Sequence, residues 1–491
     1  MLRIKNDICF AVLILLLGTN SAPAQESTVQ PAPHEFDSGS RQADWLDIIR
    51  PPSMPVDQTA AERELYDSFI ESLANGSFSE ADVAAKRMVT LALEHADDNY
   101  YAVSQALINL AVTQQLAEDS DSAILNYEAS ISHIEQRGNL LSQRLIAPLR
   151  GLATAQYANG QPATALRTLD RALHISNVNA GPHSFAQIPL LDLMLQTRMD
   201  QDDQAGAKKM LERIHTLALR EYSLGSEELL PTLIYKADVE KRLGMQLAQR
   251  ETYKDIIKIT ARTRGNDHFS LIDTYLKIAR TYVYDAEGFF YRSLPTAPTA
   301  EWYYKKAIAI ADSNPDADVL TKSTCLLALA DYYTIAGVYG KAHSLYAQTW
   351  DLLSAEESRH AQRNTELAQL KALSKRRPHN YANFGYKSDI HEAKPEDLLS
   401  GAITLSYTVS EHGTTKDVEI IATDPAGFEQ MELRARQAIK KFVFRPRLVD
   451  GKAVESPDQR YRHDYFYRTS DLRRSGAESR GRATTSAARI N

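Results

Sequence analysis

Cysteine is almost absent from this sequence of 491 residues, which contains only Cys9 and Cys325. Two cysteines cannot build a disulfide framework, and their spacing fits no zinc site. A strong excess of one charge is also lacking: the net charge is −7, which gives no marked attraction to nucleic acid or to an anionic membrane. With 43% hydrophobic and 24% charged residues, the composition is that of a globular chain.

Motifs of catalysis are lacking as well. The sequence has no P-loop, no G-x-G-x-x-G, no G-x-S-x-G and no H-E-x-x-H. Its 13 histidines are scattered, and no paired carboxylates mark a cleft. We therefore expect no enzyme, no catalytic residue, no metal site and no cofactor. Catalytic residues that come together only in the folded chain would leave no local sequence motif, so an enzyme is kept as an alternative.

The first residues have the pattern of a secretory signal peptide. Arg3 and Lys5 precede the apolar run Ile8–Leu17, and the small residues around Pro23 follow it. The run is shorter than the roughly 20 residues that span a bilayer. The pattern predicts cleavage after Ala24, which would remove residues 1–24 and leave the chain in the periplasm. The alternative is an uncleaved inner-membrane anchor. Residues 25–59, with five prolines, are expected to form a linker. Its apolar pairs Trp45-Leu46 and Ile48-Ile49 could dock onto the first helices, or the segment could stay loose.

A repeat with a period of 42 residues organises residues 60–356. Its reference positions lie 42 residues apart, except for a last step of 51: Phe69, Ala111, Ala153, Leu195, Ala237, Ala279 and Ala330. Seven positions after the reference stand residues expected to end a helix: Gly76, Glu118, Gly160, Asp202, Gly244 and Gly337. Small residues stand twelve positions after the reference residue, and bulky residues stand sixteen positions after it. This spacing predicts helix–turn–helix units that bury one apolar face by stacking.

The longer last step predicts nine extra residues in the turn of the sixth unit. They fall within 284–298, where Phe289-Phe290-Tyr291 could be a partner-binding knob or a flap folded onto the array. Cys325 lies on an apolar helix face and is expected to be a buried, inert thiol.

The repeat resembles the tetratricopeptide (TPR) family. Leu152-Ala153, Gly160, Ala165 and Leu169 match its leucine–small, turn, small and bulky pattern. The resemblance implies an α-helical superhelical solenoid of about seven helix pairs, a fold that binds protein segments of many kinds.

After the array, residues 357–391 are expected to form a capping helix over Glu356–Lys375 and then a hinge. The apolar period then changes from 3.6 to 2. Ala402–Val409 and Lys416–Thr423 alternate as strands around a turn at His412-Gly413. A helix is expected over Phe428–Lys441 and a last strand over Tyr461–Tyr467. This order predicts a small α+β domain.

This domain resembles the C-terminal domain of the TonB energy transducers, over residues 392–469. The match includes Phe442-Val443-Phe444-Arg445-Pro446, which stands for the family's Trp-x-Phe-x-Pro, and Gly451 after it. Family members bind an extended peptide of an outer-membrane receptor by adding it to a sheet edge. The resemblance places that edge in the last strand, with Tyr461, His463, Tyr465 and Tyr467 as candidate partner-binding residues. Edge protection is the alternative role for this strand. Residues 470–491 read as a disordered basic tail.

The two resemblances together imply a non-enzymatic periplasmic adaptor. The array would bind one protein of the cell envelope and the TonB-like domain another, such as an outer-membrane receptor. The alternative is a membrane-anchored energy transducer for outer-membrane transport, which requires the first 24 residues to stay on the chain.

Overall fold

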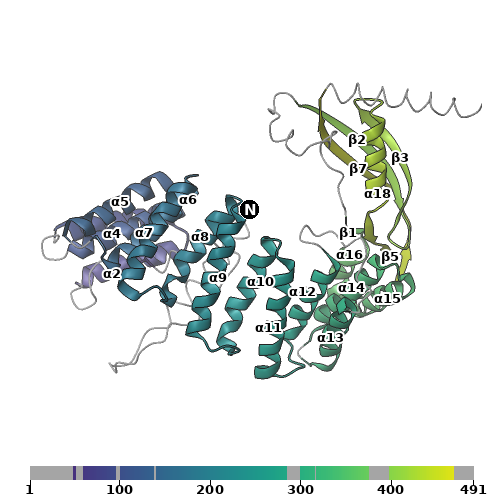
Figure 1. The fold of residues 1–491 in the computed structure, drawn as a ribbon, viewed down its shortest axis with the longest axis horizontal. Coiled ribbons are helices and arrows are strands. Elements are labelled where there is room, and N and C mark those ends of the chain that lie inside the picture. The colour runs from purple at the N-terminus through teal and green to yellow at the C-terminus, as the bar shows by residue number, and fades with distance from the viewer. Residues whose placement is uncertain are drawn as a thin grey trace, which may run out of the picture. The chain divides into compact units, whose positions relative to one another are not determined.

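The computed structural model describes residues 48–50, 59–94, 100–137, 140–284, 299–315, 317–374 and 398–468 (Figure 1). These residues form two compact units, divided between Leu243 and Gly244. The predicted signal peptide, the aromatic cluster of the insert and the basic tail lie outside the described residues.

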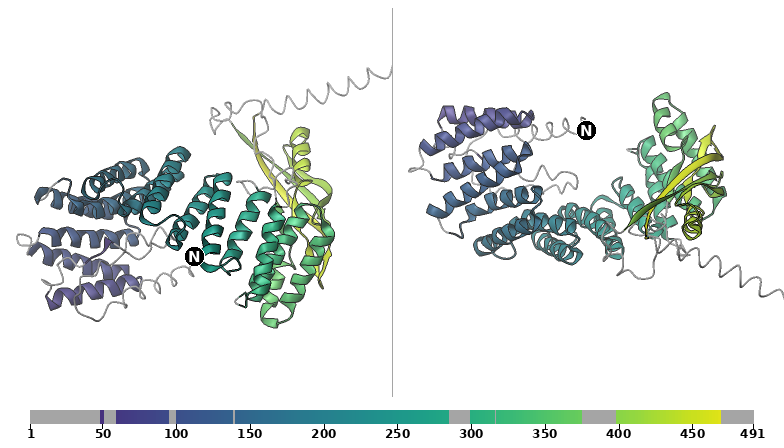
Figure 2. Two further views of the ribbon diagram at one scale, coloured as in Figure 1. Left: turned by 60° about the horizontal axis from the view of Figure 1, so that its bottom comes forward. Right: turned by 90° about the horizontal axis from the view of Figure 1, so that it is seen from above.

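Unit 1 is a stack of antiparallel helices joined by short turns (Figure 2). Its helices are α2 (Ala60–Ala74), α3 (Phe78–Glu94), α4 (Tyr100–Leu116), α5 (Ser120–Arg137), α6 (Ile146–Ala158), α7 (Pro162–Ala180), α8 (Ile188–Asp200), α9 (Gln204–Glu221) and α10 (Leu230–Arg242). Short sequence signals explain where several of these helices begin. Thr59 and Glu62 form a capping box at α2, and Pro162 opens α7, where a missing N–H costs nothing.

Unit 2 continues with helices and then turns to strands. Its helices are α11 (Gln246–Arg264), α12 (Leu271–Val283), α13 (Thr299–Ser313), α14 (Val319–Ile335), α15 (Tyr339–Ser354), α16 (His360–Glu366) and α18 (Glu429–Ile439). Its strands are β1 (Lys371–Ser374), β2 (Leu399–Val409), β3 (Thr415–Asp424), β4 (Val443–Arg445), β5 (Arg447–Val449), β6 (Lys452–Val454) and β7 (Ser456–Tyr467).

The predicted helix ends are confirmed by the backbone. All six residues at that repeat position have a positive φ between 58° and 74°, including Glu118 and Asp202, which are not glycines. A left-handed residue just after a helix lets its last carbonyls accept hydrogen bonds from the turn. In the turn after α6, Gly160 N–H donates to Tyr157 O and Gln161 N–H to Gln156 O. The same backbone geometry therefore sets the turn in repeat after repeat.

The predicted inter-helix core is also confirmed. The small and bulky positions of the repeat are 7% exposed or less in every copy, from Ala81 and Ala85 to Ala342 and Tyr346. Small side chains let paired helices approach, and the bulky residue one turn later fills the groove beside them. Cys325 is fully buried in the core of unit 2, as its context predicts.

The C-terminal strands and helix form where the change of period predicts them. β2 pairs with β3 on one side and with β7 on the other, all antiparallel, which gives the order β3–β2–β7. Helix α18 lies against one face of this sheet (Figure 1), where Met431 and Ile439 pack with Leu405. At the β2–β3 turn, a Cβ on Gly413 would lie 1.9 Å from the carbonyl oxygen of Phe444, so only glycine fits.

The expected single helix over Glu356–Lys375 is wrong. Helix α16 ends at Glu366, and residues 371–374 form β1, which pairs antiparallel with β4. Leu367 is fully buried, and its carbonyl accepts a hydrogen bond from Leu448 N–H. Pairing with strands more than 70 positions later outweighs the local helical pattern. Residues 375–391 of the expected hinge lie outside the described residues.

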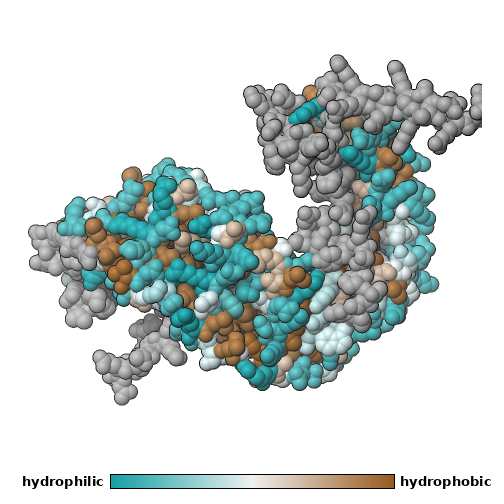
Figure 3. Space-filling model, in the orientation of Figure 1, coloured by the Kyte–Doolittle hydropathy of each residue, from teal (hydrophilic) through white to brown (hydrophobic). Residues whose placement is uncertain are grey.

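No helix in the described parts of the chain is long and apolar enough to span a membrane. Figure 3 shows that hydrophilic residues cover most of the visible face of each unit, with apolar residues gathered in separate patches.

Candidate functional site

A short segment from the expected linker lies on the helices of unit 1. Ile48 and Ile49 are 6% and 5% exposed and belong to the hydrophobic core of that unit. Arg50 follows them and is exposed to solvent. The sequence leaves open whether Ile48-Ile49 docks onto the first helices or stays loose within the Pro-rich stretch. The structure shows both residues docked on the array.

Two amide side chains of α4 hold this segment by its main chain. Gln105 donates from Nε2 to Ile48 O at 3.0 Å, and Asn109 donates from Nδ2 to Arg50 O at 2.8 Å. Arg50 N–H donates to Asn109 Oδ1 at 3.4 Å, and Gln105 Nε2 donates to the same oxygen at 3.0 Å. Asn109 is fully buried and Gln105 3% exposed, so the segment supplies the partners that buried amides require. We call Gln105 and Asn109 the amide pair.

The segment is hydrogen-bonded to α4, and a cavity of about 240 Å³ lies beside its Ile48. The cavity is lined by residues of α6, the end of α7 and the start of α8, both apolar (Ile146, Leu190) and polar (Arg150, Ser176). The surface therefore combines amides that bind the main chain with a cavity of mixed lining next to them.

Burial raises the pKa of Tyr66 in α2 to about 12, and the nearby Arg50 cation acts in the opposite direction.

Sequence reasoning missed the amide pair, although a signal for it exists. Gln105 and Asn109 stand six and two positions before the reference residue Ala111, one helical turn apart on one face. The matching positions of the third repeat are Ala147 and Gly151, and no other repeat has two amides there. The available clue was the position of Gln105 and Asn109 within the otherwise apolar middle of α4.

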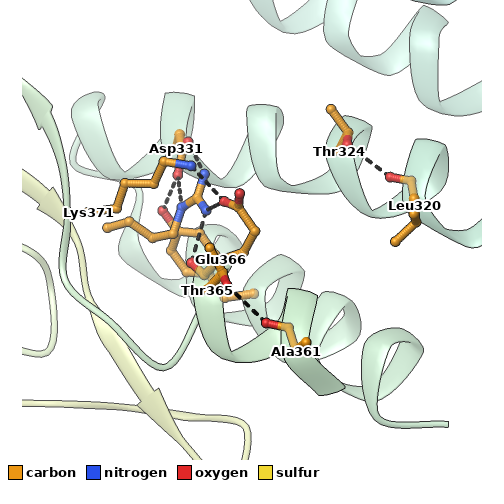
Figure 4. Close-up of polar contacts among 9 residues, drawn as sticks. Leu320, Thr324, Asp331, Ala361, Thr365, Glu366 and Lys371 are labelled. Carbon is orange, nitrogen blue, oxygen red and sulfur yellow. Dashed lines mark hydrogen bonds and ion pairs between the residues drawn. The ribbon is translucent and has the colours of Figure 1, made fainter. Parts of the chain in front are cut away.

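A second cluster of polar groups joins the sheet region to the helices of unit 2. Arg445 of β4 donates to both carboxylate oxygens of Asp331 in α14, at 2.9 and 2.7 Å. Its Nη1 lies 2.6 Å from Glu366 Oε2 and 3.0 Å from the Glu366 carbonyl oxygen. Tyr346 OH donates to Asp331, and Lys371 to Glu366. Figure 4 shows Asp331, Glu366 and Lys371 converging on this point.

Further contacts near this cluster also join the strand region to the helices of unit 2. The Tyr339 ring stacks on the His412 ring with centroids 4.6 Å apart, and His343 Nε2 lies 2.9 Å from the Glu411 carbonyl oxygen. A Cβ added at Gly451 would lie 3.3 Å from the Trp350 ring. Helix α15 thus contacts the β2–β3 turn and the β5–β6 turn, while α14 and α16 hold Arg445 of β4. Sequence reasoning did not foresee this docking, because its partners are far apart in the chain.

The candidate edge residues face the interior of the sheet domain. His463, Tyr465 and Tyr467 are 2%, 1% and 9% exposed, and they pack with Tyr461 in the core that includes Phe428, the N-cap residue of α18. The outward side chains of β7 are Arg460, Arg462, Asp464 and Phe466. β7 ends the strand order of the described residues, so the expected edge position holds. A peptide added there would meet main chain and the outward side chains, not the four that the sequence suggests.

The motif residues of the C-terminal domain have structural positions. Phe442 and Phe444 are buried with Tyr407 and Tyr461, Pro446 is buried, and Gly451 forms the β5–β6 turn with φ of 74°. Arg445 lies within the motif but is not one of its matching residues. It makes the ion pairs to the helices.

In the residues that the structure describes, no group of three His, Cys, Asp or Glu side chains could hold a metal ion. Burial raises the pKa of the Cys325 thiol to about 12, and the Asp312 carboxylate acts in the same direction. Such a thiol is a poor nucleophile.

Comparison with known proteins gives partial matches in structure only. No family model and no curated protein matches the sequence. A Podosopora anserina protein of nearly identical TPR-like repeats is 17% identical, with 43% of this chain and 97% of that chain covered and a TM-score of 0.35. The C-terminal part of a TPR repeat-containing protein from Cytophaga hutchinsonii is 13% identical, with 61% and 98% covered and a TM-score of 0.40. BtubC from P. vanneervenii is 17% identical, with 61% and 92% covered and a TM-score of 0.24.

These scores are too low to carry an argument about function. The TPR-like architecture of the chain rests on its own helix pairs, its repeated left-handed turns and its buried small–bulky stripe.

Proposed function

We propose that this protein is a non-enzymatic adaptor that binds a short segment of a partner protein on the first helices of unit 1. The observation that supports this is the amide pair, which forms three hydrogen bonds with main-chain groups of the segment Ile48–Arg50. Main-chain recognition of this kind accepts many sequences, and neighbouring pockets add selectivity. The cavity beside Ile48 offers such a pocket.

A second partner is proposed for the C-terminal sheet. The resemblance to TonB C-terminal domains and the end position of β7 support addition of a peptide strand, such as one from an outer-membrane receptor. The ion pairs of Arg445 hold β4 to α14 and α16, and Phe444 N–H of β4 donates to Gly413 O in the β2–β3 turn, so the second binding surface would be tied to the helices of unit 2. A charged and aromatic outward face on β7 is equally what edge protection requires, and the experiment below separates the two.

The proposed location is the periplasm, because the first 24 residues have the pattern of a cleavable signal. N-terminal sequencing of the protein from cell envelopes tests this. A chain that begins at Gln25 and fractionates with the periplasm supports the adaptor. A chain that keeps Met1 and sediments with inner membrane would instead favour the membrane-anchored transducer.

Site-specific photo-cross-linking in the cell tests the adaptor function. A photoreactive residue at Ala147, in the cavity lining, is expected to form adducts with a partner protein. The control position is Leu125 in α5, which is 66% exposed and does not line the cavity. Equal adducts at both positions, or none at Ala147, would count against a partner on the first-helix face.

The same method tests the sheet. A photoreactive residue at Phe466, on the outward face of β7, should give adducts with a partner different from that seen at Ala147. The matched control is Ile421 of β3, which is 51% exposed in the outer strand on the other side of the sheet. Absence of any adduct at Phe466 would favour edge protection over peptide binding.

A further inference from the structure

Resting on the proposed function, we propose that Ile48–Arg50 is an internal competitor for the surface made by the amide pair and the cavity beside Ile48, here called the groove, and that the partner's peptide has the same chemistry. That chemistry is two adjacent aliphatic residues in a segment whose main chain meets the amide pair. The chain's own segment would occupy the amide pair until a partner segment replaces it.

The hydrogen bonds show how a replacement can work. The hydrogen bonds that Gln105 and Asn109 form with the segment go to main-chain atoms of Ile48 and Arg50, which other peptides also carry. A segment with the same backbone conformation and register can therefore satisfy both amides. If the amides lost the segment without a replacement, they would have to be hydrated on the exposed face.

The buried side chains define which segments fit best. Ile48 and Ile49 are almost fully buried against the core of unit 1, so polar residues at these positions would lose apolar burial. Arg50 is exposed, and its Nη1 donates to Ile49 O within the segment at 2.8 Å. Two adjacent aliphatic positions therefore describe the segment that the groove accepts.

Covalent attachment gives the internal segment its advantage. Arg50 lies only nine positions before Thr59, the N-cap of α2, so the segment stays near the groove when it is released. A short connection of this kind keeps a ligand at an effective concentration of about a millimolar. A free peptide must compete with that concentration, and its apparent affinity falls by the fraction of time that the groove is open.

Fluorescence anisotropy with a labelled synthetic peptide tests the proposal. The probe has the sequence of residues 44–53, and the protein is the full chain. The release variant is Ile48→Ser with Ile49→Ser, which removes the buried aliphatic groups of the internal segment. We expect the probe to bind the release variant at least about ten-fold more tightly than the unchanged chain. Adding Asn109→Ala to the release variant should reverse most of that gain.

Matched controls separate the groove from general effects. Leu125→Ser removes an exposed aliphatic side chain of α5 and should leave probe binding unchanged. Asn126→Ala removes an amide that bonds Gln114 instead of the segment, and it should also be neutral. A probe with serine at both isoleucine positions should bind at least about ten-fold more weakly to the release variant, because it loses its buried groups. A chain that begins at residue 51 serves as a second release variant should the first fail to fold.

The outcomes distinguish the two proposals. Equal binding of the probe to the unchanged and released chains would overturn the internal competitor while the peptide groove stands. Absence of binding to both folded release variants would overturn the groove itself. Binding that is independent of Asn109 would overturn the amide pair as its recognition element.

Discussion

The guanidinium of Arg445 holds both carboxylate oxygens of Asp331, a residue 114 positions earlier in the chain. Arg445 comes from a strand and Asp331 from a helix, and their side chains are only 5% and 16% exposed. A buried ion pair contributes little over an apolar contact when intact, but loss of one partner leaves a buried charge uncompensated. The docking of β4 on α14 and α16 therefore depends on Arg445.

Replacing Arg445 should loosen this docking. Arg445→Leu leaves Asp331 and Glu366 without their cation, and we expect a loss of about 3–5 kcal/mol in local stability. Native-state hydrogen exchange of the amides in α14 and β4 measures it. The control is Arg462→Leu, whose pair with Asp464 is 68% exposed on both sides and should cost no more than about 1 kcal/mol. Similar losses in the two variants would contradict the assigned role.

Acid should weaken the same docking. Burial alone would raise the pKa of Glu366, but hydrogen bonds and charge from Lys371 and Arg445 outweigh it, and the pKa lies below the usual 4.5. A carboxyl group with a lowered folded-state pKa stabilises the fold fully above its unfolded-state pKa and loses this effect as the pH falls through the folded value.

The measurement is urea unfolding of the full chain at several pH values between 7 and 3. Glu366→Gln should lower stability at pH 7 and flatten its dependence on pH in the acidic range. Asp273→Asn is the control, because Asp273 is 69% exposed in its pair with Lys277. An unchanged acid slope in Glu366→Gln would show that the fold does not depend on this carboxylate.

Glu118 should be better replaced by glycine. Its φ of 63° is a left-handed conformation, which costs an L-residue roughly 1 kcal/mol or more. We expect Glu118→Gly to raise the unfolding free energy of unit 1 by about 0.5–1 kcal/mol, measured by thermal or urea unfolding. Gly160→Ala, at the same repeat position, should lower it by about 1 kcal/mol. A Cβ at Gly160 meets nothing within 4 Å, so that loss would come from the backbone alone.

Cys325 should resist alkylation in the folded chain. Its thiol pKa rises from 9.0 to about 12, so at pH 8 the reactive thiolate is roughly 1,000-fold rarer than for an exposed cysteine. Iodoacetamide labelling, followed by mass spectrometry, should be slow in native protein and fast in urea. A Cys9→Ser background leaves Cys325 as the only thiol. Rapid stoichiometric labelling of native protein would show that the thiol is accessible.

Much of the array could be predicted because its signals are local. A residue that ends a helix, such as Gly160, and a small–bulky pair, such as Ala165 and Leu169, act within one or two turns of chain. The alternation in Ala402–Val409 likewise marks β2, since one face of that strand is buried. Such patterns can be recognised in a sequence because the backbone geometry of helices and strands repeats at fixed intervals.

The expected helix over Glu356–Lys375 failed for the opposite reason. Its pattern is helical, but Lys371–Ser374 pairs with β4, and this pairing comes from a distant part of the chain. The side-chain role expected for Tyr465 met the same limit. Alternation shows that it shares a face with Tyr461 and Tyr467, but only the placement of α18 decides that this face is the buried one.

The sequence by itself determined the 42-residue repeat, the helices and turns of each repeat, and the main strands of the C-terminal domain. These depend on residues close together in the chain, whose conformational preferences act directly on the backbone. Only the tertiary structure decided that the amide pair of α4 holds Ile48–Arg50 and that Arg445 joins a strand to two helices. Both contacts link positions more than 50 residues apart, and a single sequence does not encode which distant group will satisfy a buried amide or charge.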